Sequence, residues 1–270
     1  MTTDAVTTPL QELTEVLESL IGPGGCPWDK EQTPESLCDY VLEEAFELVD
    51  AIRSGKAADV REELGDVMFL MAFIGRLYQD KAGFSLNDAM SDVAAKMIRR
   101  HPHVFDEVTF KNKEEQLKAW EAIKRSEKSD GEGRPKGIYD SLPAGLPPLL
   151  KAYRLHSKAA RVGFTWPEDE DVLRQVESER QEWEEALESG SREQQEAEFG
   201  DYLFTLVELG RRKGIKANAA IGGANVRFLQ RFEAMEALCR ERGLDFPSLS
   251  FEEKDALWNE VKLHDSSKNT

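Results

Sequence analysis

An internal repeat of acidic residues constrains this chain more than any other feature of its sequence. Segments 43–77 and 178–212 align without a gap, 135 positions apart, and share 11 identical residues of 35. Four acids of each segment are among the identical residues; they are Glu44, Glu47, Glu63, Asp66, Glu179, Glu182, Glu198 and Asp201. Self-similarity at a fixed offset indicates two copies of one structural unit. The sequence therefore predicts two tandem domains.

The acids of each copy follow the spacing of helices. Each copy holds two pairs of acids three residues apart, and Ser54-Gly55 or Ser189-Gly190 separates the pairs. At about 100° per residue, Glu63 falls inside an apolar arc that includes Val67. A carboxylate on such a face is costly unless a positive charge meets it. A single glutamate would be read as part of a solvated face, but eight acids in phase with apolar stripes favour a metal site. Oxygen ligands point to Mg²⁺ or Mn²⁺.

Glu-Glu-x-x-Glu at 43–47 and Glu-x-x-Asp at 63–66 resemble the motifs of MazG-type, all-α nucleoside triphosphate pyrophosphohydrolases. Three further runs match that family: Gly25 to Lys30, Arg99 to Phe105 and Val162 to Trp166. The resemblance covers residues 10–125 and 145–265. It implies a homodimer built from four-helix bundles. It also implies hydrolysis of a nucleoside triphosphate to the monophosphate and pyrophosphate.

Apolar periodicity predicts an all-α fold. The expected helices span about 9–21, 34–53, 58–80, 86–100, 114–128, 149–161, 169–188, 191–213, 217–242 and 251–263. Residues 22–33 contain too much Gly and Pro for a helix. We place an N-terminal domain at 9–128, a linker at 129–148 and a C-terminal domain at 149–264. Neither copy has enough helices to bury both of its apolar stripes, so each should pack on another copy.

The proposed chemistry needs a base and cations besides the metal ligands. Glu47 or Glu182 would take a proton from the attacking water, and basic side chains would stabilise the leaving pyrophosphate. The expected substrate-binding residues are Trp28, Lys30, Lys96, Arg99, Arg100, Asn225, Arg227, Arg231 and Trp258. Several of them have a simpler alternative. Cations in a last helical turn already suit the helix dipole, and the tryptophans would serve equally as anchors of a loop or core.

The second copy departs from the family pattern at a few positions. Ser178 replaces the acid found at Glu43, and Gly223 stands where the basic helix of the family would have a lysine. The Cys-Pro-Trp-Asp loop is also missing from this copy. The four acids survive in both copies, so which copy is active stays open.

Composition and residue spacing weigh against other functional classes. The net charge of −17 argues against a nucleic-acid polymer as partner. A di-iron bundle would use Glu-x-x-His pairs, which the four histidines do not form. A non-catalytic helical dimer that binds nucleotide or a partner protein remains an alternative. Three cysteines without a Cys-x-x-Cys pair, no membrane-length apolar run and no signal-peptide pattern predict a soluble, cytoplasmic protein.

Overall fold

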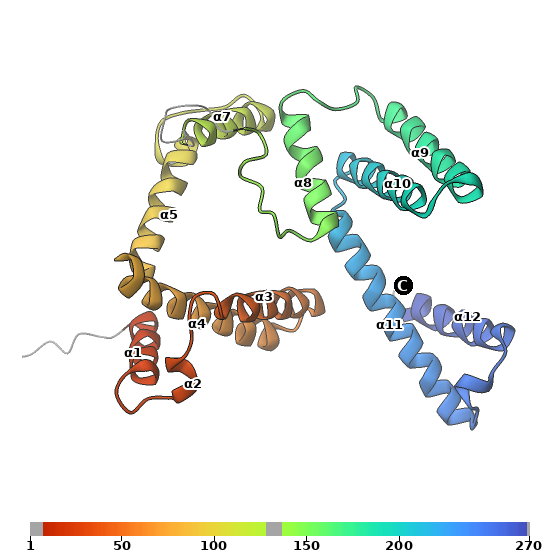
Figure 1. The fold of residues 1–270 in the computed structure, drawn as a ribbon, viewed down its shortest axis with the longest axis horizontal. Coiled ribbons are helices and arrows are strands. Elements are labelled where there is room, and N and C mark those ends of the chain that lie inside the picture. The colour runs from red at the N-terminus through yellow and green to blue at the C-terminus, as the bar shows by residue number, and fades with distance from the viewer. Residues whose placement is uncertain (1–7, 128–136, 269–270) are drawn as a thin grey trace, which may run out of the picture. The chain divides into compact units, whose positions relative to one another are not determined.

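The structure, a computed structural model, describes residues 8–127 and 137–268. The chain divides into two compact units, residues 1–127 and 128–270. Within the described ranges both units consist of helices and contain no strand, which confirms the all-α prediction (Figure 1). None of the helices built from those residues has the length and hydropathy needed to cross a bilayer.

The first unit holds seven helices among its described residues. They are α1 (Pro9–Ile21), α2 (Pro27–Lys30), α3 (Leu37–Ser54), α4 (Ala57–Ala82), α5 (Leu86–Arg100), α6 (Pro102–Phe105) and α7 (Lys113–Ser126). Helices α3 and α4 form an antiparallel hairpin (Figure 1). Helix α4 also packs against α1 and α5, so the hairpin is anchored along one helix.

The second unit repeats the hairpin with different surroundings. Its helices are α8 (Pro148–Arg161), α9 (Asp169–Ser189), α10 (Arg192–Arg212), α11 (Ala217–Arg242) and α12 (Phe251–Lys268), with a short 3₁₀ turn at Phe246–Ser248. Helices α9 and α10 pair as α3 and α4 do, and α8 packs on α10. The buried Lys158 ammonium donates to the Ile138 carbonyl at 3.0 Å and the Ser141 hydroxyl at 2.9 Å, which fixes residues 137–142 to α8.

The two hairpins are closed by different turns. Helix α3 ends at Gly55, whose φ of 73° is left-handed and favours glycine. The corresponding Gly190 is extended, with φ −84°, and the next residue, Ser191, forms a capping box with Gln194 at the start of α10. A Cβ on Gly190 would lie 2.7 Å from the Ala186 carbonyl oxygen, so glycine is needed there for space rather than for φ.

Several predicted helix boundaries were wrong. Pro27–Lys30 is a helical turn, although the Gly and Pro content of 22–33 predicted none; proline is tolerated as the first helical residue because its missing N–H needs no partner there. Pro102 likewise opens α6, a turn that the sequence did not predict, although α5 ends at Arg100 as expected. Helix α3 begins at Leu37 instead of Pro34, after a turn in which the Thr33 hydroxyl accepts from the Ser36 amide at 3.1 Å.

Each unit has a small apolar core. In the first unit Leu17, Leu37 and Phe73 are fully buried, with Leu70 beside them. In the second unit the core comprises Met235, Cys239, Leu257 and Val261, and Trp258 packs against it. These cores join α1, α3 and α4 in one unit and α11 and α12 in the other.

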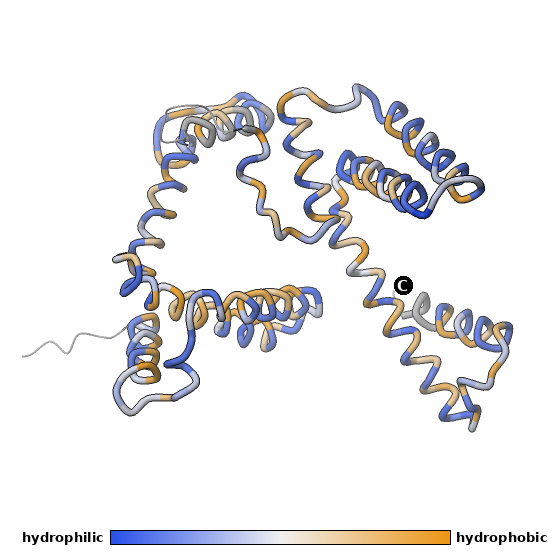
Figure 2. The backbone as a smooth tube through the Cα atoms, in the orientation of Figure 1, coloured by the Kyte–Doolittle hydropathy of each residue, from blue (hydrophilic) through white to orange (hydrophobic). Residues whose placement is uncertain are grey.

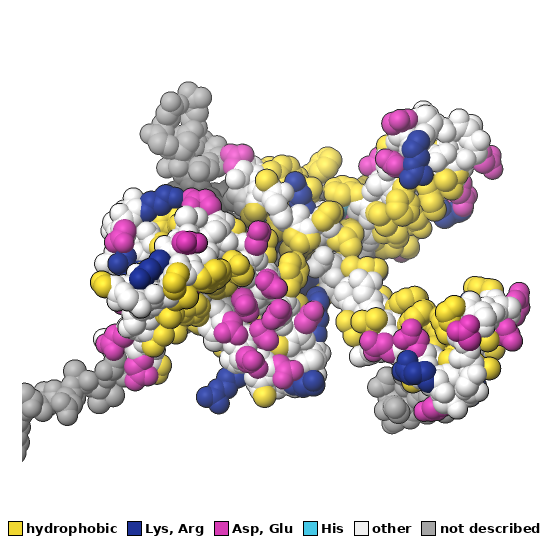
Figure 3. Space-filling model, turned by 60° about the horizontal axis from the view of Figure 1, so that its bottom comes forward, with side chains coloured by type: hydrophobic (Ala, Val, Ile, Leu, Met, Phe, Trp, Pro, Cys, Tyr) yellow, Lys and Arg dark blue, Asp and Glu magenta, His cyan; other side chains and the backbone are white. Residues whose placement is uncertain are grey.

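Several predicted apolar stripes are not buried. Ile52 and Phe228 are each 58% exposed and Leu64 is 51% exposed, and α5 buries none of its side chains. Orange residues run along the helices in Figure 2, and yellow side chains reach the surface shown in Figure 3. Part of each apolar stripe is therefore open within one chain, as the small number of helices in each copy predicts.

The first core predicts an unequal cost for two phenylalanine truncations. Phe73→Ala leaves a cavity in a closely packed core and should lower the free energy of unfolding by about 3–5 kcal/mol. Phe105→Ala removes a ring that is more than half exposed and should change it by less than about 0.5 kcal/mol. Urea unfolding followed by circular dichroism measures both. Equal losses would contradict the placement of the core.

Candidate metal centre

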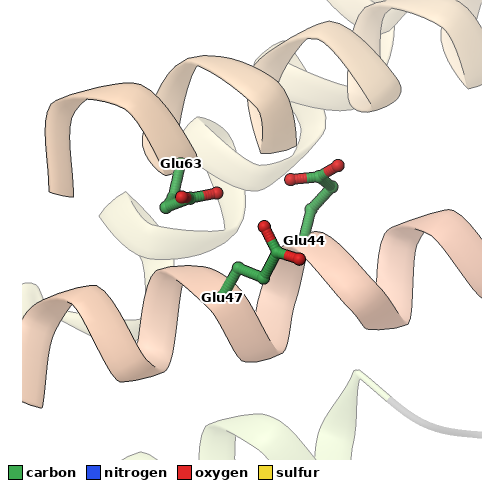
Figure 4. A group of neighbouring side chains, drawn as sticks. All are labelled: Glu44, Glu47 and Glu63. Carbon is green, nitrogen blue, oxygen red and sulfur yellow. The ribbon is translucent and has the colours of Figure 1, made fainter. Parts of the chain in front are cut away.

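Three glutamates meet across the first hairpin. Glu44 and Glu47 come from neighbouring turns of α3, and Glu63 comes from α4 (Figure 4). One carboxylate oxygen of each lies within 4.8 Å of the others. Glu44 and Glu63 are half-buried, whereas Glu47 is exposed. The hairpin thus brings together, from two rigid helices, three of the four carboxylates that the spacing of the acids predicts to converge.

The second hairpin repeats this triad. Glu179 and Glu182 from α9 and Glu198 from α10 meet the same 4.8 Å limit with the same pattern of burial. The Ser178 hydroxyl donates to a Glu182 oxygen at 2.9 Å, so the residue that replaces the acid found at Glu43 orients a triad carboxylate. Gln175 donates to a Glu179 oxygen at 2.9 Å. The second triad is therefore held by hydrogen bonds as well as by its helices.

The first triad is electrostatically strained. Burial, followed by the charges of Asp66 and Glu47, raises the pKa of Glu44 above its ordinary value. Burial, followed by the charges of Glu47 and Glu44, raises the pKa of Glu63. A bound cation removes this repulsion. The donor set, which contains oxygen alone, fits a hard divalent ion rather than a thiolate- or imidazole-preferring metal.

The fourth acid of each copy lies outside its triad. Asp66 is close enough to raise the pKa of Glu44 and Glu63, but the group whose oxygens converge contains only the three glutamates. Asp201 is likewise not among the converging residues of the second hairpin. Both aspartates lie one turn beyond the α4 or α10 glutamate, at the edge of the cluster.

The predicted phosphate-binding cations of α5 contact another part of the unit. The Arg100 guanidinium lies 2.6 Å from a Glu127 oxygen and 5.6 Å from the centre of the Trp120 ring, and Arg99 approaches the same carboxylate at 3.4 Å. The hydrogen bond from Arg100 is the main reason that the pKa of Glu127 lies below its ordinary value. Lys96 is half-buried on the same helix. The structure thus brings the two arginines together, and both contact the carboxylate of Glu127.

The predicted residues of the loop at 26–30 lie at the surface. Trp28 is half exposed, and its ring meets Tyr40 edge-on with centroids 5.6 Å apart. Lys30 is exposed, while the Asp29 side chain between them is buried. Trp28 thus rests on α3 with one part of its ring open to solvent.

The predicted set of the second copy gathers partly at α11 and α12. The Arg231 guanidinium lies 5.8 Å from the centre of the Trp258 ring, and Phe228 packs on the same ring at 5.3 Å. Asn225 and Arg227 are exposed. A Cβ on Gly223 would lie 3.3 Å from an Arg227 nitrogen, so the glycine that replaces the expected lysine leaves room for Arg227 to lie along the helix.

A buried polar group in the second unit was missed from the sequence. The Glu208 carboxylate is 1% exposed and accepts two hydrogen bonds from Arg211, at 2.6 and 2.8 Å, and one from the Thr165 hydroxyl at 3.2 Å. Burial opposes its ionisation, but the hydrogen bond and charge of Arg211, together with His156 and Thr165, leave the pKa of Glu208 below its ordinary value. The signal was available: Glu208 interrupts the apolar stripe of its helix, at the position that Phe73 holds in the first copy.

Proteins with known names resemble this chain over most of its length. The profile of the MazG nucleotide pyrophosphohydrolase domain matches residues 32–105, which include the first triad. The nucleoside triphosphate pyrophosphohydrolase of Escherichia coli K12 is 34% identical over 258 residues, which are 94% of this chain and 97% of that protein. The chain belongs to the MazG family. A relative from Thermotoga maritima, named nucleoside triphosphate pyrophosphohydrolase/pyrophosphatase MazG, is 36% identical over 95% of this chain and 97% of its own length.

Another relative of this chain is a longer protein. The Bacillus subtilis protein YabN, which is described as uncharacterized, is 38% identical over 248 residues. These residues are 92% of this chain but 50% of YabN. The relatives therefore match both halves of the present chain over nearly the whole length of each half. The domain profile matches only the first half.

Removing one triad charge should stabilise the metal-free protein. Because the pKa of Glu63 is raised in the folded state, that state loses stability as pH rises through this pKa, and the loss persists at pH 7. We expect Glu63→Gln to raise the melting temperature at pH 7 in EDTA. The gain should vanish near pH 4, where the wild-type Glu63 carboxyl is protonated. Differential scanning fluorimetry measures both values.

The same variant should respond less to metal. Added Mg²⁺ should raise the melting temperature of the wild type, because a ligand that binds only the folded state stabilises it. The shift should be smaller for Glu63→Gln. Glu62→Gln removes a neighbouring charge outside the triad and should keep the wild-type shift. Identical Mg²⁺ shifts in all three proteins would rule out metal binding at this triad.

Proposed function

We propose that this protein hydrolyses nucleoside triphosphates to nucleoside monophosphates and pyrophosphate, with Mg²⁺, or Mn²⁺ in its place, as the cofactor. The observation that carries the proposal is the pair of converging glutamate triads, one on each hairpin, in a member of the MazG family. Metal ligands would be the triad glutamates, with Asp66 and Asp201 at the edge. When bound, the ion would polarise the α-phosphate and lower the pKa of a water.

The protein would supply the base that accepts the proton of the attacking water. Glu47 and Glu182 are the exposed members of the two triads, so they are the carboxylates that water reaches most easily. Their roles as bases follow from this accessibility and from their position beside the other two glutamates. The hydroxyl of Ser178 would steady Glu182 in the second copy.

Basic side chains would bind the pyrophosphate portion of the substrate. Arg99 and Arg100 suit phosphate oxygens because guanidinium groups donate in a fork. They contact Glu127 in this structure, so a bound triphosphate would take the place of the Glu127 carboxylate as their anionic partner. Lys96 and Lys30 would assist in the first copy, and Arg227 and Arg231 in the second. Trp28, Asn225 and Trp258 complete the proposed substrate contacts.

The chain would act as a homodimer of two-domain subunits, with domains at 9–128 and 149–264 joined by 129–148. An open apolar stripe on α3, formed by Leu42, Phe46 and Val49, supports this assembly. These residues are three or four positions apart and share one face of the helix. The three free cysteines agree with a reducing compartment, and we place the protein in the cytoplasm.

Triad variants test the activity. Pyrophosphate release from a panel of nucleoside triphosphates with Mg²⁺ should fall about a hundredfold or more when the ligand of the working triad is replaced, because metal stabilisation is worth several kcal/mol. Glu63→Gln and Glu198→Gln, tested singly, show which triad works. The double variant should be inactive. Glu62→Gln serves as the charge-matched control. A wild-type protein that binds nucleotides but releases no pyrophosphate would favour the non-catalytic alternative.

A charge on the apolar stripe tests the dimer. The wild-type protein should have a molar mass near twice 30.5 kDa in light scattering after gel filtration. Phe46→Asp should shift the mass toward that of one chain, since the carboxylate would be buried unpaired at the interface. Phe105→Asp places the same charge at a similarly exposed ring and should leave the mass unchanged. A wild-type protein with the mass of one chain would refute the assembly.

A further inference from the structure

The two glutamate triads differ in the residues beside them. In the second copy two neutral side chains of α9 donate hydrogen bonds to triad carboxylates. The Ser178 hydroxyl donates to Glu182 at 2.9 Å. The Gln175 amide donates to Glu179, also at 2.9 Å. Each donor lies one helical turn before the glutamate that it contacts, so the four side chains share one side of the helix.

The first copy has other residues at the positions of the two donors. At the repeat offset, Glu43 and Tyr40 replace the serine and the glutamine. An ionised carboxylate accepts hydrogen bonds but cannot donate them. Glu43 instead adds its negative charge to the repulsion at Glu44. The Tyr40 ring packs edge-on against Trp28. The triads thus share their ligands but not the residues around them.

The hydrogen bonds of the second copy orient both carboxylates that α9 contributes. Glu182 is the exposed member of its triad, so packing alone would leave its side chain free to change rotamer. Ser178 restricts it from the same helix. Glu179 is half-buried, and Gln175 holds it in the same way. These two ligands are therefore oriented before an ion binds.

A carboxylate that accepts such a hydrogen bond can still bind metal. An ionised carboxylate offers two oxygens with about four acceptor sites, so one hydrogen bond leaves room for an ion. Hydrogen-bond partners fix the orientation of metal ligands in proteins, and their loss weakens metal binding by about 10- to 100-fold. Both donors are neutral, so they orient the glutamates without cancelling the charge that attracts a cation.

Ordered ligands distinguish Mg²⁺ from Ca²⁺. Mg²⁺ requires a nearly ideal octahedron with bonds of about 2.1 Å, whereas Ca²⁺ accepts longer bonds and variable geometry. Carboxylates that are held in place therefore favour the ion with the stricter requirement. Carboxylates that can move adapt to the larger ion, which takes more ligands.

We propose that Gln175 and Ser178 are positioning residues of the second triad and make it more selective for Mg²⁺ over Ca²⁺ than the first triad. The first triad has Glu43 at the position of the serine, which gives it more negative charge and no hydroxyl beside Glu47. This inference rests on the proposed function for the role of the triads as metal sites.

Metal competition on proteins with a single intact triad tests the inference without an assay of activity. Full-length Glu44→Gln/Glu63→Gln retains only the second triad. Full-length Glu179→Gln/Glu198→Gln retains only the first. Each protein is loaded with Mn²⁺, and Mg²⁺ or Ca²⁺ is titrated in while electron paramagnetic resonance records the Mn²⁺ that is released. The ratio of Mg²⁺ to Ca²⁺ affinity should be higher for the second triad.

Substitutions in the protein that retains the second triad test the two donors. Ser178→Ala should weaken Mg²⁺ binding about tenfold and Ca²⁺ binding less, because Mg²⁺ depends more on a fixed carboxylate. Gln175→Met should have the same effect. Ser178→Thr keeps the hydroxyl and should keep the original ratio. Ser189→Ala removes a hydroxyl that donates to the Glu185 carbonyl on the same helix, and should change neither affinity.

The first triad offers the reverse test. In the protein that retains it, Glu43→Ser places a hydroxyl one helical turn before Glu47, the arrangement of the second copy. This change should raise the ratio of Mg²⁺ to Ca²⁺ affinity. Glu43→Ala removes the same charge without supplying a hydroxyl and should leave the ratio unchanged. Glu43 is exposed, so neither substitution should unfold the protein.

The positioning residues and the metal sites can fail separately. Equal ratios for the two triads, or a ratio that Ser178→Ala does not change, would overturn the positioning roles and leave the metal sites in place. A wild-type protein that binds no Mn²⁺ would refute the metal sites and the positioning roles together. Selective Mg²⁺ binding that depends on Ser178, without pyrophosphate release, would support the positioning roles and refute the proposed hydrolysis.

Discussion

Repulsion between carboxylates held on packed helices is the constraint on which the rest of this structure depends. Glu44, Glu47 and Glu63 converge because α3 and α4 are fixed against each other, and the raised pKa of Glu44 and Glu63 records the cost. The core around Phe73 supplies the rigidity that opposes this repulsion. A cation between the carboxylates turns the same geometry from a cost into a source of binding energy.

The open apolar faces belong to the same balance. A hairpin has one side on its own core and another side toward solvent, and here the solvent side also carries apolar residues, such as Leu42 and Phe46. A chain with two acidic hairpins and little core has limited means of holding them rigid by itself. Pairing of subunits would cover these faces and stiffen the triads at once.

The sequence predicted the features that follow from local periodicity. Helices, the hairpins and the convergence of three acids in each copy all depend on spacing within one or two turns. It failed where burial depends on distant packing. Phe228 and the apolar side of α5 look like core residues from periodicity alone, yet Phe228 stays more than half exposed and α5 has no buried side chain. Glu208 was missed because its partners, His156 and Thr165, come from other segments of the unit. The pairing of Arg100 with Glu127 was invisible for the same reason.

The unlike turns of the two hairpins show what their history has preserved. Gly55 is left-handed and Gly190 is extended, yet the same number of residues separates the acids on either side. One residue more or fewer would turn the second helix of the hairpin by about 100° and carry its glutamate away from the other two. The conformation of the turn thus differs between the two copies, while the length of the connection is the same. In this protein the number of residues between the acids, rather than the conformation of the turn, determines the direction in which the glutamates point.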